Sequence, residues 1–121
     1  MKKLYALRGA TCCENTEEDI RAQVAAMYCE MLELNKFSEE DIVSIIFSVT
    51  SDLNAINPCT ALRKTGHAQS DTALFSAQEP MYTASLEKTI RVMIHCYLEE
   101  GSKVKHVYRN GAEVLRPDRI G

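Results

Sequence analysis

The sequence lacks an excess of basic residues, a long apolar run and an apolar leader. Its 14 lysines and arginines are outnumbered by 17 aspartates and glutamates, which leaves a net charge of −3. Such a chain has no positive field for nucleic acid or an anionic membrane. The longest apolar stretch, residues 42–51, is about half of a bilayer span, and Leu4–Leu7 is too short for a signal peptide. These absences predict a cytoplasmic protein without a nucleic-acid or membrane partner.

Cofactor and disulfide signals are also scarce. The five cysteines are odd in number and scattered, which argues against a secreted disulfide framework. The five glycines form neither a dinucleotide-binding nor a phosphate-binding loop, and the three histidines lack the spacing of a zinc motif. Cys12-Cys13 has no evident histidine partner, so we interpret both as structural residues. We therefore expect no metal and no cofactor.

Length and periodicity indicate one domain over residues 1–121. A chain of this size and average composition is enough for a single core. Apolar residues recur at helical spacing from the cap Thr16 to Leu34, which predicts a helix of about five turns. A brief helical turn is expected before Ile42. Pro58 and Gly66 bracket a second, short helix over residues 58–64.

The remaining apolar segments are short or alternate with period two, as strands do. The predicted strands are Tyr5–Ala10, Ile42–Thr50, Thr72–Ser76, Thr89–Leu98, and a hairpin in which Val104–Tyr108 and Glu113–Arg116 flank a tight turn at Asn110-Gly111. We predict an α+β fold, a mixed sheet of about five strands with one long and one or two short helices on one face. The other face carries mixed residues such as Ser44, Ser48 and His95. A second copy of the chain is expected to cover it, giving a homo-oligomer.

Two arginines occupy positions that are unfavourable for solvated charges. Arg8 closes an apolar strand and Arg91 lies inside the run Thr-Ile-Arg-Val-Met-Ile. A guanidinium there is costly unless an anion meets it. That anion is either a protein carboxylate or a small anionic ligand, which the planar fork of arginine binds bidentately.

An ordered set of short motifs resembles the small AroH-class chorismate mutases. The set comprises Arg8-Gly9-Ala10-Thr11, Thr16-Glu17-Glu18-Asp19, Ser48-x-Thr50-x-Asp52-Leu53-x-Ala55, Pro58 with Arg63, Gln78-Glu79, Ile90-Arg91-Val92-Met93, His106-Val107-Tyr108 and Val114-Leu115-Arg116-Pro117-Asp118. The resemblance implies a homotrimer of α+β subunits whose sheets form a pseudo-α/β-barrel, with active sites in clefts between subunits. It also implies conversion of chorismate to prephenate, toward phenylalanine and tyrosine, without a cofactor.

The resemblance also assigns roles to residues. Arg91 would hold the ether oxygen and the enolpyruvyl carboxylate of chorismate, and Glu79 would accept the proton of the ring hydroxyl in a hydrogen bond. The implied catalytic residues are Arg8, Glu79, Arg91 and Tyr108. The implied substrate-binding residues are Arg8, Arg63, Phe75, Ser76, Ala77, Gln78, Glu79, Arg91, Tyr108 and Leu115.

Three positions differ from the family pattern. Asn57 and Thr60 stand where the family often has an aromatic residue and a lysine, and Ser76 stands where a cysteine is familiar. Two alternative functions therefore remain. One is a non-catalytic trimer that binds a small carboxylate, and the other is an enamine or imine deaminase-like enzyme on a similar trimeric fold.

Overall fold

The computed structural model describes residues 1–67 and 72–115. The elements in chain order are β1 (Lys2–Cys12), α1 (Glu17–Asn35), the 3-10 turn η1 (Glu39–Asp41), β2 (Ile42–Val49), α2 (Pro58–Lys64), β3 (Ala73–Gln78), β4 (Thr89–Glu99), β5 (Val107–Arg109) and the 3-10 turn η2 (Ala112–Leu115). They form a five-stranded mixed sheet and two helices, which confirms the predicted fold class. Within the described ranges no helix is long and apolar enough for a bilayer span.

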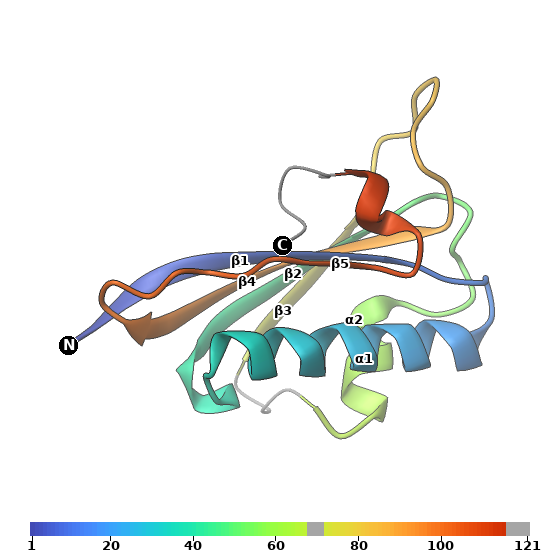
Figure 1. Cartoon of the computed structure of the whole chain (residues 1–121). Helices are drawn as coiled ribbons and strands as arrows, with labels where there is room; N and C mark the ends of the chain where they lie inside the picture. Colours follow the sequence, from blue (N-terminus) through green and yellow to red (C-terminus); the bar gives the residue numbers. More distant parts are fainter. Residues whose placement is uncertain (68–71, 116–121) are drawn as a thin grey trace.

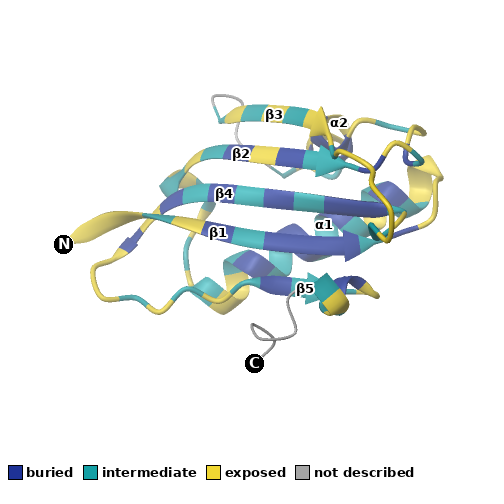
Figure 2. Ribbon diagram, turned by 90° about the horizontal axis from the view of Figure 1, so that it is seen from above, coloured by how far each residue is buried: buried dark blue, intermediate teal, exposed yellow. Residues whose placement is uncertain are grey.

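The strands lie in the order β3-β2-β4-β1-β5, so β4 is central (Figure 2). It pairs antiparallel with β1 over the full length of both strands and antiparallel with β2 on its other side. Each outer strand is parallel to its neighbour, β3 to β2 and β5 to β1. Because of the long pairing with β4, β1 runs from Lys2 to Cys12, beyond the predicted Tyr5–Ala10.

The predicted C-terminal hairpin is wrong. Asn110 and Gly111 do form a turn, with φ of 54° and 103°, but the chain after them forms η2 rather than a returning strand. The free edge of β1 provides the backbone partners of β5, so the strand adds there in parallel. The carboxylate of Glu113 accepts a hydrogen bond from the amide of Gly111 at 2.7 Å and closes the turn locally. Arg116, the last residue of the predicted strand, lies outside the described residues.

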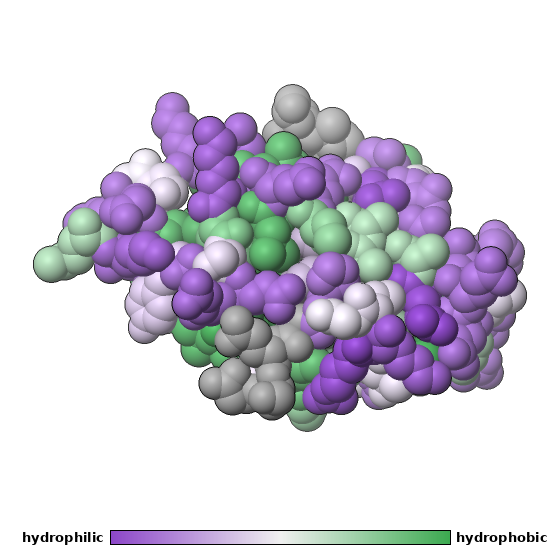
Figure 3. Space-filling model, turned by 90° about the horizontal axis from the view of Figure 1, so that it is seen from below, coloured by the Kyte–Doolittle hydropathy of each residue, from purple (hydrophilic) through white to green (hydrophobic). Residues whose placement is uncertain are grey.

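The two helices cover one face of the sheet, whereas η2 and the loop between β3 and β4 rise above the other face (Figure 1). The cap Thr16 accepts a hydrogen bond from the amide of Asp19 at 3.0 Å, as the sequence predicts. The buried stripe of α1 packs on the sheet through Ile20, Val24, Met27 and Met31. The outer surface of the helical layer is largely polar, with apolar patches between the charged side chains (Figure 3).

Gly9 of β1 faces the methionine side chains of α1. A Cβ atom built on Gly9 would lie 2.8 Å from Sδ of Met31, 3.0 Å from Cγ1 of Val92 and 3.3 Å from Sδ of Met27. A side chain at this position would therefore force these packed neighbours to shift.

We expect Gly9→Ala to lower the free energy of unfolding by about 1–3 kcal/mol through overpacking. Urea denaturation at a fixed protein concentration measures the effect. Combining it with Met31→Ala is the matched control, because the shortened side chain makes room for the new methyl group. The double variant should then lose less stability than the two single variants together. Equal stability of Gly9→Ala and the unchanged chain would contradict this account of the packing.

Candidate active site

Strand register brings polar side chains from several strands into one row across the open face. Arg91 of β4 lies opposite Ala10 of β1 and opposite Ser48 of β2. Tyr108 of β5 extends the row beyond Ala10, and Ala77 of β3 extends it beyond Ser48. The row therefore joins segments that are far apart in sequence, and the helices do not cover it.

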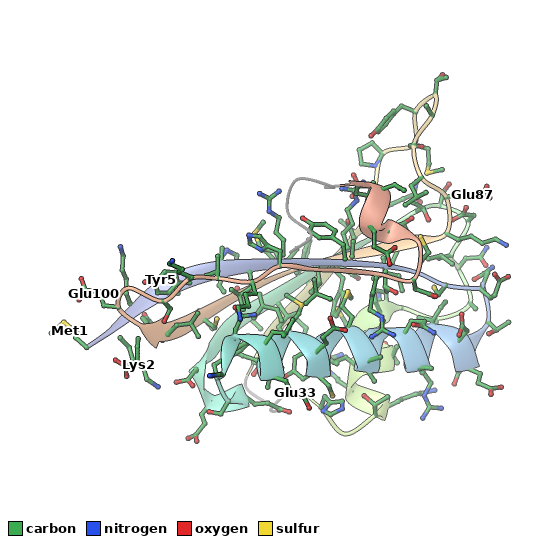
Figure 4. All side chains as sticks on the ribbon, in the orientation of Figure 1. Met1, Lys2, Tyr5, Glu33, Glu87 and Glu100 are labelled. Atoms are coloured by element: carbon green, nitrogen blue, oxygen red, sulfur yellow. The ribbon has the colours of Figure 1, made fainter. Side chains whose placement is uncertain are left out.

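A cavity of about 260 Å³ follows this row. Its lining comprises Arg8, Gly9, Ala10, Ile46, Ser48, Arg91, Val92, Met93 and Tyr108. Three of the four implied catalytic residues, Arg8, Arg91 and Tyr108, thus share one cavity. Figure 4 shows side chains standing above the sheet on the face away from the helices; Tyr5 and Glu100 mark one end of the sheet and Glu87 the other.

Glu79, the fourth implied catalytic residue, lies beside this cavity. Its amide donates a hydrogen bond to the carbonyl of Val49 at 2.7 Å, which holds the chain against β2 after β3 ends. Its Oε1 accepts a hydrogen bond from the hydroxyl of Ser48 at 2.6 Å and lies 3.6 Å from Nε of Arg91. The carboxylate is therefore placed between the two polar residues of β2 and β4.

The positive charge of the cavity is only partly balanced. Glu79 approaches Arg91, but Nε of Arg91 is buried and makes no hydrogen bond within the described chain. Among residues 1–67 and 72–115, no carboxylate lies within 4.0 Å of the Arg8 guanidinium. A protein carboxylate thus balances the charge of Arg91 in part, and in the described part of the chain none balances the charge of Arg8. An anionic ligand would complete both.

A hydrogen bond between distant residues anchors the segment that carries Tyr108. The amide of Arg8 donates to Nδ1 of His106 at 2.9 Å, so this ring nitrogen is unprotonated. The contact holds His106 beside β1, and β5 begins at the next residue. Arg8 and Tyr108 are therefore positioned by the same edge of β1.

The remaining implied binding residues are spread over other parts of the chain. Phe75 lies on the open face of β3, opposite Ile46, and is 65% exposed. Arg63 is exposed on α2, and Leu115 is half-buried in η2. Ser76, Ala77 and Gln78 line a second hollow, of about 330 Å³, together with Asn57 and Pro58. One chain does not bring these residues into the cavity of Arg8 and Arg91.

The second hollow contains two of the three departures from the family pattern, and they contact each other. Oδ1 of Asn57 accepts from the amide of Cys59 at 2.8 Å and caps α2, while its Nδ2 donates to the hydroxyl of Ser76 at 3.0 Å. Burial raises the pKa of the Cys59 thiol, and the hydrogen bond with Ser76 and the charge of Arg63 act in the opposite direction. Thr60, the third departure, is exposed on α2.

The polar groups of the cavity suit electrostatic binding of a ligand. The five cysteines are free, and burial raises the pKa of Cys13 to about 12 and of Cys96 to about 11, which keeps both as thiols at neutral pH. Within the described ranges, no three histidine, cysteine, aspartate or glutamate side chains are arranged to hold a metal ion. Two guanidiniums, a phenol and a carboxylate can instead bind a ligand with carboxylate and hydroxyl groups.

The sequence pattern missed part of this lining. Ile46, Met93 and Ala10 give the cavity its apolar walls, and Ser48 contacts Glu79. Period-two alternation does place these residues on the open face, but it does not reveal which of them lie opposite Arg91. That information depends on the pairing of β2, β4 and β1.

Comparison with known proteins identifies relatives over nearly the whole chain. Residues 4–119 match the family described as chorismate mutase type I. The chain is 35% identical to the chorismate mutase AroH of Bacillus subtilis over 117 residues, which cover 95% of this chain and 91% of that one. It is 36% identical to AroH of Thermus thermophilus over 115 residues, 93% of each chain. A solved chorismate mutase from Clostridium thermocellum superposes with a TM-score of 0.84 at 46% identity, covering 91% of this chain and 98% of that one. With its fold and nearly its whole length in agreement, the chain belongs to the type I, or AroH-type, chorismate mutase family.

Proposed function

We propose that the chain catalyses the rearrangement of chorismate to prephenate in aromatic amino acid biosynthesis, in the cytoplasm. The observation that carries the proposal is the cavity in which Arg8, Arg91 and Tyr108 meet beside Glu79. Chorismate has two carboxylates, a ring hydroxyl and an enolpyruvyl ether. The cavity offers partners for one carboxylate, the hydroxyl and the ether oxygen. Family membership over nearly the whole chain supports the same conclusion.

The proposed mechanism needs no nucleophile, acid, base or cofactor. In one cyclic shift of electrons the ether C–O bond breaks while a C–C bond forms within the same molecule. The protein contributes by holding the compact reactive conformer and by stabilising negative charge that builds on the ether oxygen. Arg91 supplies the donor to that oxygen, Arg8 and Tyr108 hold the enolpyruvyl group, and Glu79 accepts the hydrogen bond of the ring hydroxyl.

We further propose that the active form is a homotrimer with sites between subunits. Arg63, Phe75 and Leu115 are not part of the cavity of their own chain, and the open face carries exposed apolar residues including Ile46 and Phe75. An assembly that places one subunit on the open face of another would bury those residues and complete the binding of the second carboxylate. Arg63 is the cation proposed for that role.

A direct assay tests the proposed function. Purified protein incubated with chorismate should abolish the ultraviolet absorbance of the substrate, and acid should convert the product to phenylpyruvate. Tight chorismate binding without turnover would instead indicate the carboxylate-binding trimer. Neither turnover nor binding would favour a different enzyme on this fold, such as an enamine or imine deaminase.

We expect Arg91→Ala to lower kcat by about 10²- to 10³-fold, because it removes a preorganised donor to the developing charge. Arg91→Lys should not restore activity, since one ammonium group cannot reproduce the guanidinium fork. Arg63→Ala should mainly raise KM. Arg21→Ala on α1, outside the cavity, is a control that should change neither constant. Steady-state kinetics with chorismate measures all four variants. Full kcat in Arg91→Lys would disprove the electrostatic mechanism.

We expect the oligomer in solution to have three times the 13.6 kDa mass of the chain. Sedimentation equilibrium at micromolar concentration determines this mass. Replacing the exposed Phe75 by Glu should shift the equilibrium toward monomer, whereas the same change at exposed Ala22 on α1 should not. A stable monomer of the unchanged protein would refute the proposed assembly.

A further inference from the structure

Ser48 is a polar residue in an otherwise mostly apolar strand. β2 has the sequence Ile-Val-Ser-Ile-Ile-Phe-Ser-Val, and its two serines both lie on the open face. Ser44 forms a hydrogen bond with Nδ1 of His95 at 3.0 Å. Ser48, four residues further, lines the cavity opposite Arg91. The two serines therefore have different partners on the same face of the same strand.

The contact of Ser48 with Glu79 is short and charge-assisted. Its hydroxyl donates to Oε1 of Glu79 at 2.6 Å, within the range of an O–H donor bound to a carboxylate. Nε of Arg91 approaches the same oxygen at 3.6 Å. Ser48 and Arg91 therefore both approach Oε1 of Glu79. Together these contacts restrict the rotation of the carboxyl group.

Few side chains of the neighbouring strands compete for the Glu79 carboxylate. The strands on either side of its contact, β2 and β3, contain no ionisable side chain. β4 contributes Arg91, and the next ionisable residue on its open face, His95, is bonded to Ser44. In the described part of the chain, the orientation of the Glu79 carboxylate thus depends on Ser48 and Arg91.

We propose that Ser48 is a positioning residue for the rearrangement. It fixes the Glu79 carboxylate in the orientation in which Oε2 can accept the hydroxyl of the substrate. This inference rests on the proposed function, in which Glu79 binds that hydroxyl. Arg91 alone is a weaker anchor, because its Nε is beyond hydrogen-bond distance from Oε1. Arg91 attracts the Glu79 carboxylate, and the hydrogen bond from Ser48 fixes its orientation.

Kinetics of Ser48→Ala test the role in the reaction. We expect kcat to fall about tenfold, the effect of losing a hydrogen bond to a charged group, with a smaller change in KM. Ser48→Thr retains the hydroxyl and suits a strand, so it should recover most of the activity. Ser44→Ala is the matched control, because it removes a serine from the same strand and face but leaves Glu79 untouched. In a Glu79→Gln background, Ser48→Ala should change kcat less than twofold.

Carbon NMR provides a readout that a purely structural role would not move. The carboxyl carbon of Glu79 reports the hydrogen bond that its Oε1 accepts from Ser48. Its chemical shift should change in Ser48→Ala and return in Ser48→Thr, whereas Ser44→Ala should leave it unchanged. Protein labelled at glutamate carboxyl carbons allows this measurement without substrate.

These measurements separate this inference from the proposed function. If the unchanged protein does not convert chorismate, the proposed function fails, while NMR still tests the hydrogen bond between Ser48 and Glu79. An unchanged kcat and an unchanged chemical shift of the Glu79 carboxyl carbon in folded Ser48→Ala would overturn the positioning role. So would equal effects of Ser44→Ala and Ser48→Ala, because a general disturbance of β2 would then explain both.

Discussion

The alternation of side chains along the central strand β4 is the constraint on which core and cavity both depend. Ile90, Val92 and Ile94 point to the helices and are almost fully buried, whereas Arg91 and Met93 point to the open face and line the cavity. A shift of one residue in the pairing of β4 would place the guanidinium in the core and expose the apolar residues. Core stability therefore holds Arg91 in place.

Electrostatic imbalance then explains why the open face suits an anion. A charge placed on a sheet is stabilised by a partner or by water. Glu79 provides a carboxylate near Arg91, whereas in the described part of the chain no carboxylate lies within 4.0 Å of the Arg8 guanidinium. The overall charge of −3 conceals this local excess of positive charge. Bound chorismate would supply the missing negative charge, so substrate binding and relief of this imbalance are the same event in the proposed mechanism.

Local signals predicted those parts of the fold whose determinants lie close together in sequence. The cap at Thr16, the proline that starts α2 and the alternation of β4 are of this kind. The segment after Tyr108 was predicted incorrectly, because its structure depends on the edge of β1 and on contacts such as Arg8 with His106, 98 residues apart. In the site, Arg8 and Arg91 could be predicted from the sequence because each lies in an apolar strand, where a charged side chain is unfavourable. Ser48 could be recognised only from the register of β2 against β4.

The distribution of the predicted binding residues links assembly to function. Within one chain the arginine cavity and the hollow of Asn57 and Ser76 are separate, so a substrate with two carboxylates meets only part of its partners. In the proposed assembly, Arg63 of a neighbouring subunit supplies the cation that the cavity lacks. The second carboxylate of chorismate is then bound only in the oligomer. Substrate that bridges two subunits must in turn stabilise the oligomer by mass action. The uncovered face of the sheet and the arginines Arg8 and Arg91 are therefore linked in function. A neighbouring subunit would cover the face, and the bound substrate would balance the charge of the arginines.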